Sequence, residues 1–190
     1  MAKRAATDLN GAESGEIFLE HKRKKKRGDE ISGHGHFWFT VYARSLYISW
    51  GDSPEYWTWN CYKETSDEII EVAILSKVCW LDVRGSLDIS ELPPEVVYEI
   101  VYVFMLTEGA SGWELPIQLI LALPDGRVQA SQVSLLEKPR GQWMELNVGN
   151  FQRKNGELGE VSFIIREHGG HWKQGLVIKG AVIRPIQTTL

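Results

Sequence analysis

The stretch Ser49-Trp50-Gly51-Asp52-Ser53-Pro54-Glu55-Tyr56-Trp57-Thr58-Trp59 joins two segments of strand character through a Gly-Asp-Ser-Pro turn signal. Before it, Leu46-Tyr47-Ile48 is typical of the end of a strand, and after it Trp57, Trp59 and Cys61 share one side of a period-two alternation. If the turn brings Trp50 and Trp57 together, two flat aromatic faces suit a ligand such as a pyranose ring. A core role is the alternative, because Trp is highly buried on average. We expect Trp59 and its small neighbour Cys61 in the core, and Trp50 and Trp57 in a binding site.

Further strand signals recur at short intervals from Phe37 onward. They cover residues 37–42, 46–50, 72–75, 78–84, 96–106, 117–122, 128–133, 143–148, 160–165 and 175–183. Residues 96–106 are apolar on both alternating faces, which predicts a central strand covered on both sides, and Pro124-Asp125-Gly126 predicts a hairpin. Many short strands without a long helical period predict an all-β fold, an antiparallel β-sandwich. Within it we expect Trp80 to be buried.

The N-terminal residues 1–35 differ in composition from the rest. They contain glycines, charges, few apolar residues and the run Lys22-Arg23-Lys24-Lys25-Lys26-Arg27. This composition predicts a mostly disordered basic tail. The run is consistent with a nuclear import signal, a polyanion contact or a solvated tail, and these alternatives stay open. Residues 36–190 are predicted to form one domain, long enough to bury its own core.

Charge and cysteine content limit the partners. Residues 1–36 hold eight of the 21 Lys and Arg residues and six of the 25 Asp and Glu residues, so the remainder is acidic. An acidic body disfavours nucleic-acid binding, since such domains carry a basic face. Cys61 and Cys79 give no disulfide framework and favour a reducing compartment, cytoplasmic or nuclear. No apolar run is long enough to span a bilayer, so we expect no membrane partner.

Motifs for catalysis or cofactor binding are absent from the sequence. It has no Gly-rich phosphate loop, no CxxC pair and no nucleophile elbow, so we expect no catalytic residue and no cofactor. His34-Gly35-His36 lies in the predicted tail without a third ligand nearby. His168-Gly169-Gly170-His171 is more typical of a turn than of a metal site. We therefore expect no metal.

Four ordered motifs resemble the plant phloem lectins, the group that includes the tobacco agglutinin. They are residues 47–59, Val78-Cys79-Trp80-Leu81-Asp82-Val83-Arg84-Gly85, Gln142-Trp143-Met144-Glu145-Leu146, and His171-Trp172-Lys173-Gln174-Gly175-Leu176-Val177-Ile178-Lys179-Gly180 running to Ile183-Arg184-Pro185. The resemblance implies a jelly-roll-like β-sandwich and a non-enzymatic lectin for N-acetylglucosamine (GlcNAc) oligomers or N-glycan cores. It also implies a phloem-associated or defence role, with glycoproteins or other phloem proteins as partners.

The same resemblance implies which residues bind the sugar. In the family, acidic residues matching Glu160 and Glu167 are implicated together with tryptophans matching Trp50 and Trp57. A carboxylate accepts two hydroxyl hydrogen bonds, which suits the rim of a sugar lying on an aromatic face. On an unbroken strand, however, Glu160 and Glu167 would face opposite sides and lie roughly 23 Å apart. Both reach one ligand if the chain bends between them or the ligand is long.

Two other functions stay open at this point. A glycosidase would need a facing carboxylate pair about 5–10 Å apart, and no spacing in the sequence provides one. A structural filament protein would be linked through Cys61 and Cys79. The sequence does not determine the glycan or the oligomeric state, and a homodimer is one arrangement that it allows.

Overall fold

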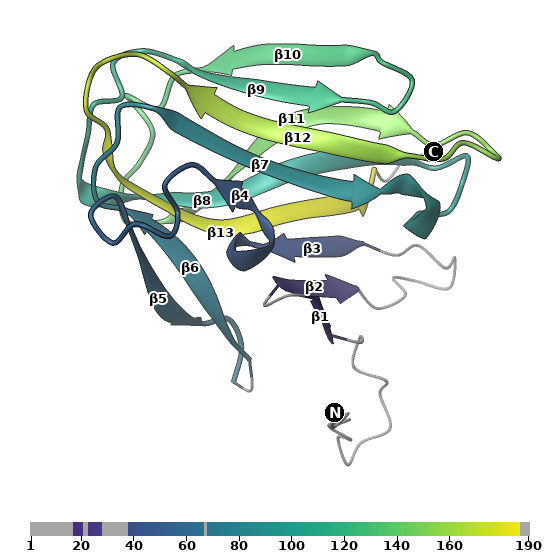
Figure 1. The fold of residues 1–190 in the computed structure, drawn as a ribbon, viewed down its shortest axis with the longest axis horizontal. Helices are drawn as coiled ribbons and strands as arrows, with labels where there is room; N and C mark the ends of the chain where they lie inside the picture. Colours follow the sequence, from purple (N-terminus) through teal and green to yellow (C-terminus); the bar gives the residue numbers. More distant parts are fainter. Residues whose placement is uncertain (1–16, 21–22, 28–37, 67, 187–190) are drawn as a thin grey trace.

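Two antiparallel β-sheets pack face to face into a β-sandwich (Figure 1). The computed structural model describes residues 17–20, 23–27, 38–66 and 68–186. The eight-stranded sheet contains β1 (Ile17–Glu20), β2 (Arg23–Arg27), β3 (Phe39–Tyr42), β13 (Gln174–Pro185), β6 (Ile69–Leu75) and β5 (Trp57–Lys63), with β8 (Val97–Ser111) between β13 and β11 (Trp143–Gln152). The five-stranded sheet has the order β10 (Val128–Val133), β9 (Ile117–Ala122), β12 (Glu160–Glu167), β7 (Leu81–Asp88) and β4 (Tyr47–Ile48). The predicted antiparallel β-sandwich is confirmed.

The core lies between the sheets because successive side chains of a strand point to opposite faces. In β8, alternate residues from Tyr98 to Leu106 are buried, and buried residues alternate with partly exposed ones along β9 and β12. Tyr102 joins the two sheets through its hydroxyl, which donates a hydrogen bond to the carbonyl oxygen of Phe163 (2.9 Å). Burial raises the pKa of Tyr102 well above its ordinary value, so this donor stays protonated.

The predicted central strand is β8, which pairs with β11 on one side and β13 on the other. Its second face is covered in part. Val101 is buried there, and Met105 packs against a smaller cluster on the outer face of the eight-stranded sheet. The buried members of that cluster are Tyr42, Ile70, Val72 and Val177.

β1 and β2 lie within the range that composition predicts to be disordered. They form a hairpin, and β2 also pairs with β3, where Lys25 lies opposite Val41. Strands pair along a sheet edge through backbone N–H and C=O groups and need no apolar side chains for this. Amino-acid composition therefore does not predict such pairing. The structure thus differs from the predicted tail in these two segments. The other residues of the 1–35 range, Lys22 of the basic run included, lie outside the described residues.

One end of the sandwich, on the left in Figure 1, gathers three loops. β7 and β12 run antiparallel, so the start of β7 meets the end of β12, with Leu81 opposite Glu167. The turn after β4 reaches the same place, because the N–H of Ser49 donates to the carbonyl oxygen of Asp82 (2.9 Å). We call this region the loop end and define it by residues 49–56, 76–80 and 168–173.

Candidate functional site

Trp50 occupies a strained backbone position in the first loop of the loop end. Its φ of 63° lies in the left-handed region, which costs a non-glycine residue roughly 1–2 kcal/mol. Its side chain is 61% exposed and touches the ring of Tyr56 at a tilt, with the centroids 5.8 Å apart. Core packing therefore does not offset the strain. Strained positions are concentrated at functional sites, and the exposed ring agrees with the predicted role.

Trp57 and Trp59 hold this loop from the start of β5. The Nε1–H of Trp57 donates to the carbonyl oxygen of Ser49 (3.1 Å), and that of Trp59 donates to the carbonyl oxygen of Gly51 (2.9 Å). Trp57 is 2% exposed, so the prediction that it presents a free aromatic face is wrong: its indole enters the core. Trp59, expected in the core, is partly buried at its edge. Trp57 therefore positions the loop of Trp50 and has no face for a ligand.

Trp80 was expected to be buried and is 50% exposed. It precedes Leu81 and Val83, which are buried, and the alternation of β7 therefore turns Trp80 away from the core. The indole stacks on the imidazole of His168, with 3.6 Å between centroids and 7° between planes. The two rings come from two loops, before β7 and after β12, and form one platform at the loop end.

A buried carboxylate anchors this platform. Asp82 is 2% exposed, and its Oδ2 lies 2.9 Å from Nε2 of His168. Nε and Nη2 of Arg84 donate to the two carboxylate oxygens at 2.6 and 2.9 Å. Burial alone would raise the pKa of Asp82, but the hydrogen bonds and charges of Arg84 and His168 lower it overall. The carboxylate is therefore ionised and forms a neutral pair with Arg84.

Glu167 also lies at the loop end, but its carboxylate faces the protein. Lys173 is fully buried and forms an ion pair with Oε2, while the N–H of Gly169 donates to Oε1 (2.8 Å). Burial by itself would raise the pKa of Glu167, but these hydrogen bonds and the charge of Lys173 lower it overall. The Lys173 ammonium also donates to the carbonyl oxygens of Cys79, Gly169 and His171. One buried side chain thus ties two loops of the loop end together.

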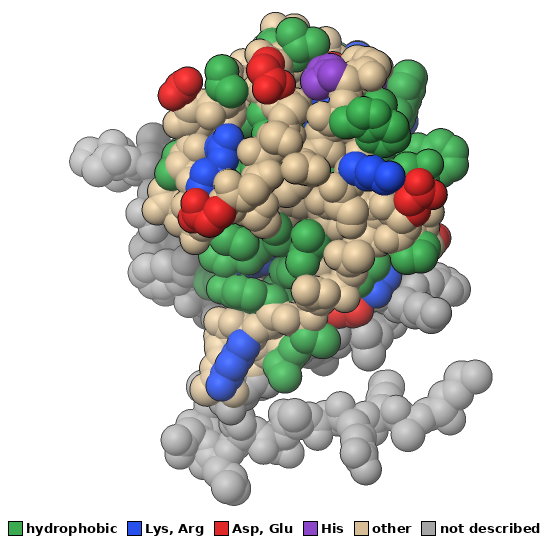
Figure 2. Space-filling model, turned by 90° about the vertical axis from the view of Figure 1, so that its left-hand side faces the viewer, with side chains coloured by type: hydrophobic (Ala, Val, Ile, Leu, Met, Phe, Trp, Pro, Cys, Tyr) green, Lys and Arg blue, Asp and Glu red, His purple; other side chains and the backbone are tan. Residues whose placement is uncertain are grey.

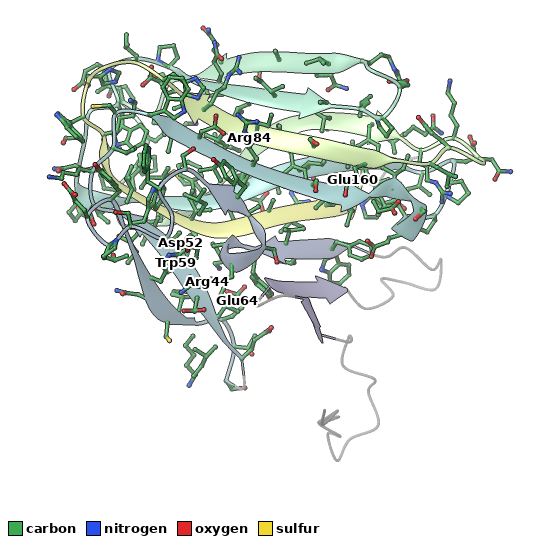
Figure 3. The ribbon with its side chains drawn as sticks, viewed as in Figure 1. Arg44, Asp52, Trp59, Glu64, Arg84 and Glu160 are labelled. Carbon is green, nitrogen blue, oxygen red and sulfur yellow. The ribbon has the colours of Figure 1, made fainter. Side chains whose placement is uncertain are left out.

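Glu160 lies at the opposite end of the same strand. β12 runs without a break from Glu160 to Glu167, and Glu160 is exposed opposite Asp88. At about 3.3 Å per residue the two carboxylates are separated by roughly 23 Å. Figure 3 shows Glu160 far from Asp52 and Trp59, which lie beside the loop of Trp50. The structure therefore gathers Trp50, Trp57 and Glu167 at one end and leaves Glu160 at the other.

A third exposed tryptophan, Trp172, completes the aromatic content of the loop end. It is 58% exposed, and the ammonium of Lys77 lies 5.6 Å from its ring centroid. Lys77 also contacts Glu55 of the first loop (3.7 Å). Figure 2, which faces this side of the molecule, shows hydrophobic side chains interspersed with charged ones and a histidine. Large flat rings surrounded by polar groups are typical of ligand sites that are apolar on one side and wet at the rim.

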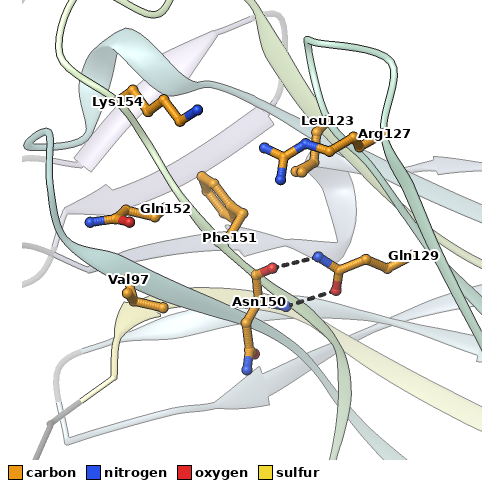
Figure 4. A pocket seen from close by; sticks show the side chains of 8 residues that line it. All are labelled: Val97, Leu123, Arg127, Gln129, Asn150, Phe151, Gln152 and Lys154. Atoms are coloured by element: carbon orange, nitrogen blue, oxygen red, sulfur yellow. Dashed lines mark hydrogen bonds between the residues drawn. The ribbon is translucent and has the colours of Figure 1, made fainter.

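Two shallow depressions adjoin different ends of the sandwich. The first, of about 390 Å³, is lined by Arg44, Gly51, Asp52, Pro54, Trp57, Thr58 and Trp59. It extends the loop end, and within its lining the guanidinium of Arg44 lies 3.7 Å from the centroid of the Trp59 ring. The second, of about 260 Å³, is lined by Val97, Leu123, Arg127, Gln129, Asn150, Phe151, Gln152 and Lys154 (Figure 4). There the amide of Gln129 is already bonded to the backbone of Asn150 (2.6 and 3.3 Å).

The histidines of the described chain have separate partners. His168 contacts Asp82, and His171 contacts Glu167 at 3.5 Å. Within the described residues, no group of three or more His, Cys, Asp or Glu side chains is placed to hold a metal ion. His34 and His36, the other histidine pair of the sequence, lie outside the described residues.

Both cysteines are free thiols. Cys61, expected to be a small core residue, is exposed on β5, so that prediction is wrong. Cys79 is half-buried, and its thiol donates to the carbonyl oxygen of Gly170 (3.4 Å). Cys79 thereby adds a further contact between the second and third loops of the loop end.

The chain is similar in sequence to known proteins over most of its length. The sequence profile of phloem protein 2 matches residues 36–185. The chain belongs to the phloem protein 2 family. It is 43% identical over 175 residues to Protein PHLOEM PROTEIN 2-LIKE A1 of Arabidopsis thaliana, covering 90% of this chain and 70% of that protein. It is 41% identical over 172 residues to a protein of Luffa acutangula named Lectin, covering 90% of this chain and 80% of that protein.

More distant likenesses are of two kinds. A protein of Coccinia grandis, also named Lectin, is 33% identical over 141 residues, covering 74% of this chain and 89% of that protein. Among solved structures, the CBM22-1 xylan-binding domain of Paenibacillus barcinonensis Xyn10C covers 94% of this chain and 100% of its own, at 15% identity and a TM-score of 0.39. A structural likeness of this size supports no statement about the ligand of the phloem protein 2 chain.

Proposed function

We propose that this phloem protein 2 chain is a non-enzymatic lectin that binds GlcNAc oligomers or N-glycan cores at the loop end. Relatives at 41% and 33% identity are named lectins, which supports sugar binding in general. The observation that carries the location is Trp50, a large ring held in strained backbone and 61% exposed. The apolar face of a pyranose stacks on such a ring, and its hydroxyls then need polar partners at the rim.

The four residues expected from sequence take different roles in this proposal. Trp50 contacts the sugar. Trp57 and Glu167 act as positioning residues, because one bonds to the Ser49 carbonyl and the other fixes Lys173. Glu160 contacts a long ligand at most, since it lies at the far end of β12.

Rim contacts are available beside Trp50. The carboxylate of Asp52 is exposed in the same loop, and it accepts hydrogen bonds from sugar hydroxyls. It also lines the depression beside the loop, together with Thr58. This provides an acceptor at the rim in place of Glu167, whose carboxylate is occupied by Lys173.

Hydrolysis by the two glutamates is disfavoured by their separation. Glycosidase carboxylates lie about 5–10 Å apart on either side of the scissile bond, whereas Glu160 and Glu167 stand at the two ends of one strand. We expect chitin oligomers incubated with the protein to keep their length, as read by mass spectrometry. Appearance of shorter oligomers would contradict the proposal of a non-enzymatic lectin.

Isothermal titration with chitotriose tests the site. Trp50→Ala should weaken binding at least tenfold, which corresponds to about 1.4 kcal/mol, while the protein stays folded. Leu158→Ala is the matched control, because Leu158 is an exposed apolar side chain at the opposite end. It should bind within twofold of the wild type. Unchanged affinity in Trp50→Ala would show that the sugar does not bind at this loop. A glycan array on which the protein binds no GlcNAc-containing glycan would refute the proposed specificity.

The wider setting is also a proposal. We infer a phloem protein that meets glycoproteins or other phloem proteins, with a defence role, in the cytoplasm, in the nucleus or in phloem sap. Nuclear import would use the basic run, of which Arg23–Arg27 forms β2. Within the described residues, no helix is long and apolar enough to cross a membrane. A homodimer is an arrangement that sedimentation of the full chain would test.

A further inference from the structure

We propose that the exposed face of Trp80 is a second sugar subsite, which takes a further, uncharged residue of an oligosaccharide held at Trp50. The proposal rests on the lectin function and specifies its ligand as a chain longer than one sugar. Its basis is the platform of Trp80 and His168.

The platform of Trp80 and His168 is held in place before any ligand binds. His168 covers one face of Trp80 in a near-parallel stack, and half of the Trp80 surface lies in solvent. His168 is fixed by Asp82, and Asp82 accepts hydrogen bonds from Nε and Nη2 of Arg84. A ring fixed in this way loses little side-chain entropy when a ligand stacks on it, so more of the contact energy appears as affinity.

The platform is not needed to hold the third loop, residues 168–173, in place. Lys173 already fixes that loop through carbonyl oxygens of Gly169 and His171 and through the ion pair with Glu167. Val78 and Lys173 also pair through their backbones. The loop therefore keeps its conformation without the stack of Trp80 on His168. This favours a role for the exposed Trp80 ring in binding a ligand at the surface.

Asp82 connects the platform to the loop of Trp50. The backbone of Asp82 accepts the hydrogen bond of Ser49, the residue before Trp50, while its side chain anchors His168. The residue before Trp50 and the imidazole that stacks on Trp80 thus both contact Asp82 of β7. A ligand that extends from Trp50 along the loop end is therefore proposed to reach Trp80.

Polar groups of Arg84 and Tyr47 lie near the platform. Arg84 uses Nε and Nη2 for Asp82, and within the described part of the chain its Nη1 has no partner. Tyr47, exposed, lies opposite Arg84 on β4 and brings a hydroxyl to the same face. Because Asp82 neutralises Arg84, the surroundings favour hydroxyl and amide groups over a charged sugar.

The test compares chitin oligomers of increasing length by isothermal titration. For the wild type, affinity should rise at least tenfold between the shortest oligomer that binds and the longest. Trp80→Leu keeps an apolar contact with His168 but has no flat face. It should bind the shortest oligomer within twofold of the wild type and lose the gain with length, whereas Trp80→Phe should keep part of that gain. Melting temperatures report that each variant is folded.

Two controls separate this subsite from the proposed function. Trp50→Ala should weaken binding of every length, and Leu158→Ala, a change to an exposed apolar side chain at the opposite end of the sandwich, should alter none by more than twofold. If the wild type binds oligomers but Trp80→Leu keeps the full gain, or loses affinity equally at all lengths, the subsite is refuted and the lectin function stands. If the wild type binds no oligomer, both proposals are refuted.

Discussion

The two ends of β12 carry the same residue type in opposite settings. Glu167 at the loop end is paired with the fully buried Lys173 and accepts a backbone hydrogen bond from Gly169. Glu160 at the other end is exposed, and no ion pair joins it to another described residue. A carboxylate in a sugar-binding family is therefore not by itself a sugar contact. Here one glutamate builds the loop end, and the other lies outside it.

Backbone strain differs between the ends in the same way. Two described residues other than glycine have a positive φ, Trp50 (63°) and Glu95 (62°). At the far end, Glu95 is compensated locally: its N–H donates to the carbonyl oxygen of Arg153, and its carboxylate accepts from the N–H of Asn155. The Trp50 side chain makes one tilted ring contact and is otherwise exposed. Hydrogen bonds hold the backbone at both strained positions, since the carbonyl oxygen of Trp50 accepts from the N–H of Ser53. The large exposed ring above the strained backbone is what distinguishes the loop end.

The largest expected effect comes from removing the charge that holds the loop end together. Lys173→Met leaves the half-buried Glu167 without its lysine and three carbonyl oxygens without their donor. Breaking a buried pair in this way should lower the free energy of unfolding by about 3–5 kcal/mol. Lys154→Met, an exposed lysine at the opposite end, should change it by less than about 0.5 kcal/mol. Urea denaturation measures both, and equal small effects would mean that Lys173 does not organise the loop end.

A middle-sized effect should follow from releasing the strain. Glycine adopts a positive φ freely, but it is more flexible when unfolded. Trp50→Gly should therefore leave the free energy of unfolding unchanged or raise it by up to about 1 kcal/mol, while chitotriose binding falls at least tenfold. Glu95→Gly is the matched change at the other end and should leave binding within twofold. A Trp50→Gly protein that is less stable by several kcal/mol would show that Trp50 packs in the core after all.

The smallest effect concerns pH. The folded-state pKa of Glu167 is lowered below its ordinary value of 4.5, so its contribution to stability is present above that value and is lost as the pH falls through the folded pKa. The loss of stability on acidification should therefore be less steep in Glu167→Gln than in the wild type. Glu160→Gln should follow the wild-type curve. Denaturation midpoints between neutral and acidic pH measure this, and identical curves for all three proteins would contradict the role given to Glu167.

The sequence was sufficient for the architecture and for part of the site. Period-two alternation and turn residues predicted the sandwich, and the turn signal placed Trp50 at its tip. Trp57 was assigned to the site and Trp59 to the core although both lie on the same side of β5, and alternation does not say where along a strand the burial ends: Trp57 is buried at the start of the strand, and Trp59 packs at the edge of the core. Trp80 was predictable: Leu81, Val83 and Leu87 set the phase of β7, and that phase turns Trp80 outward.

Other features left no local signal. Lys173 sits in a polar stretch, and one of the carbonyl oxygens that surround its ammonium belongs to Cys79, 94 residues earlier in the chain. The pairing of β2 with β3 is likewise a backbone contact that composition does not record. Both arise from tertiary arrangement, where residues distant in sequence provide the partners.

Titration of isotope-labelled protein with chitotriose, followed by nuclear magnetic resonance, tests the central claim most directly, because it observes both ends of the sandwich at once. The account predicts that the indole N–H signal of Trp50 and the backbone signals of the loop end shift with the sugar. The backbone signals of Gln129 and Asn150, which line the depression at the far end, should not shift. Shifts concentrated at Gln129 and Asn150, with Trp50 unaffected, would contradict it.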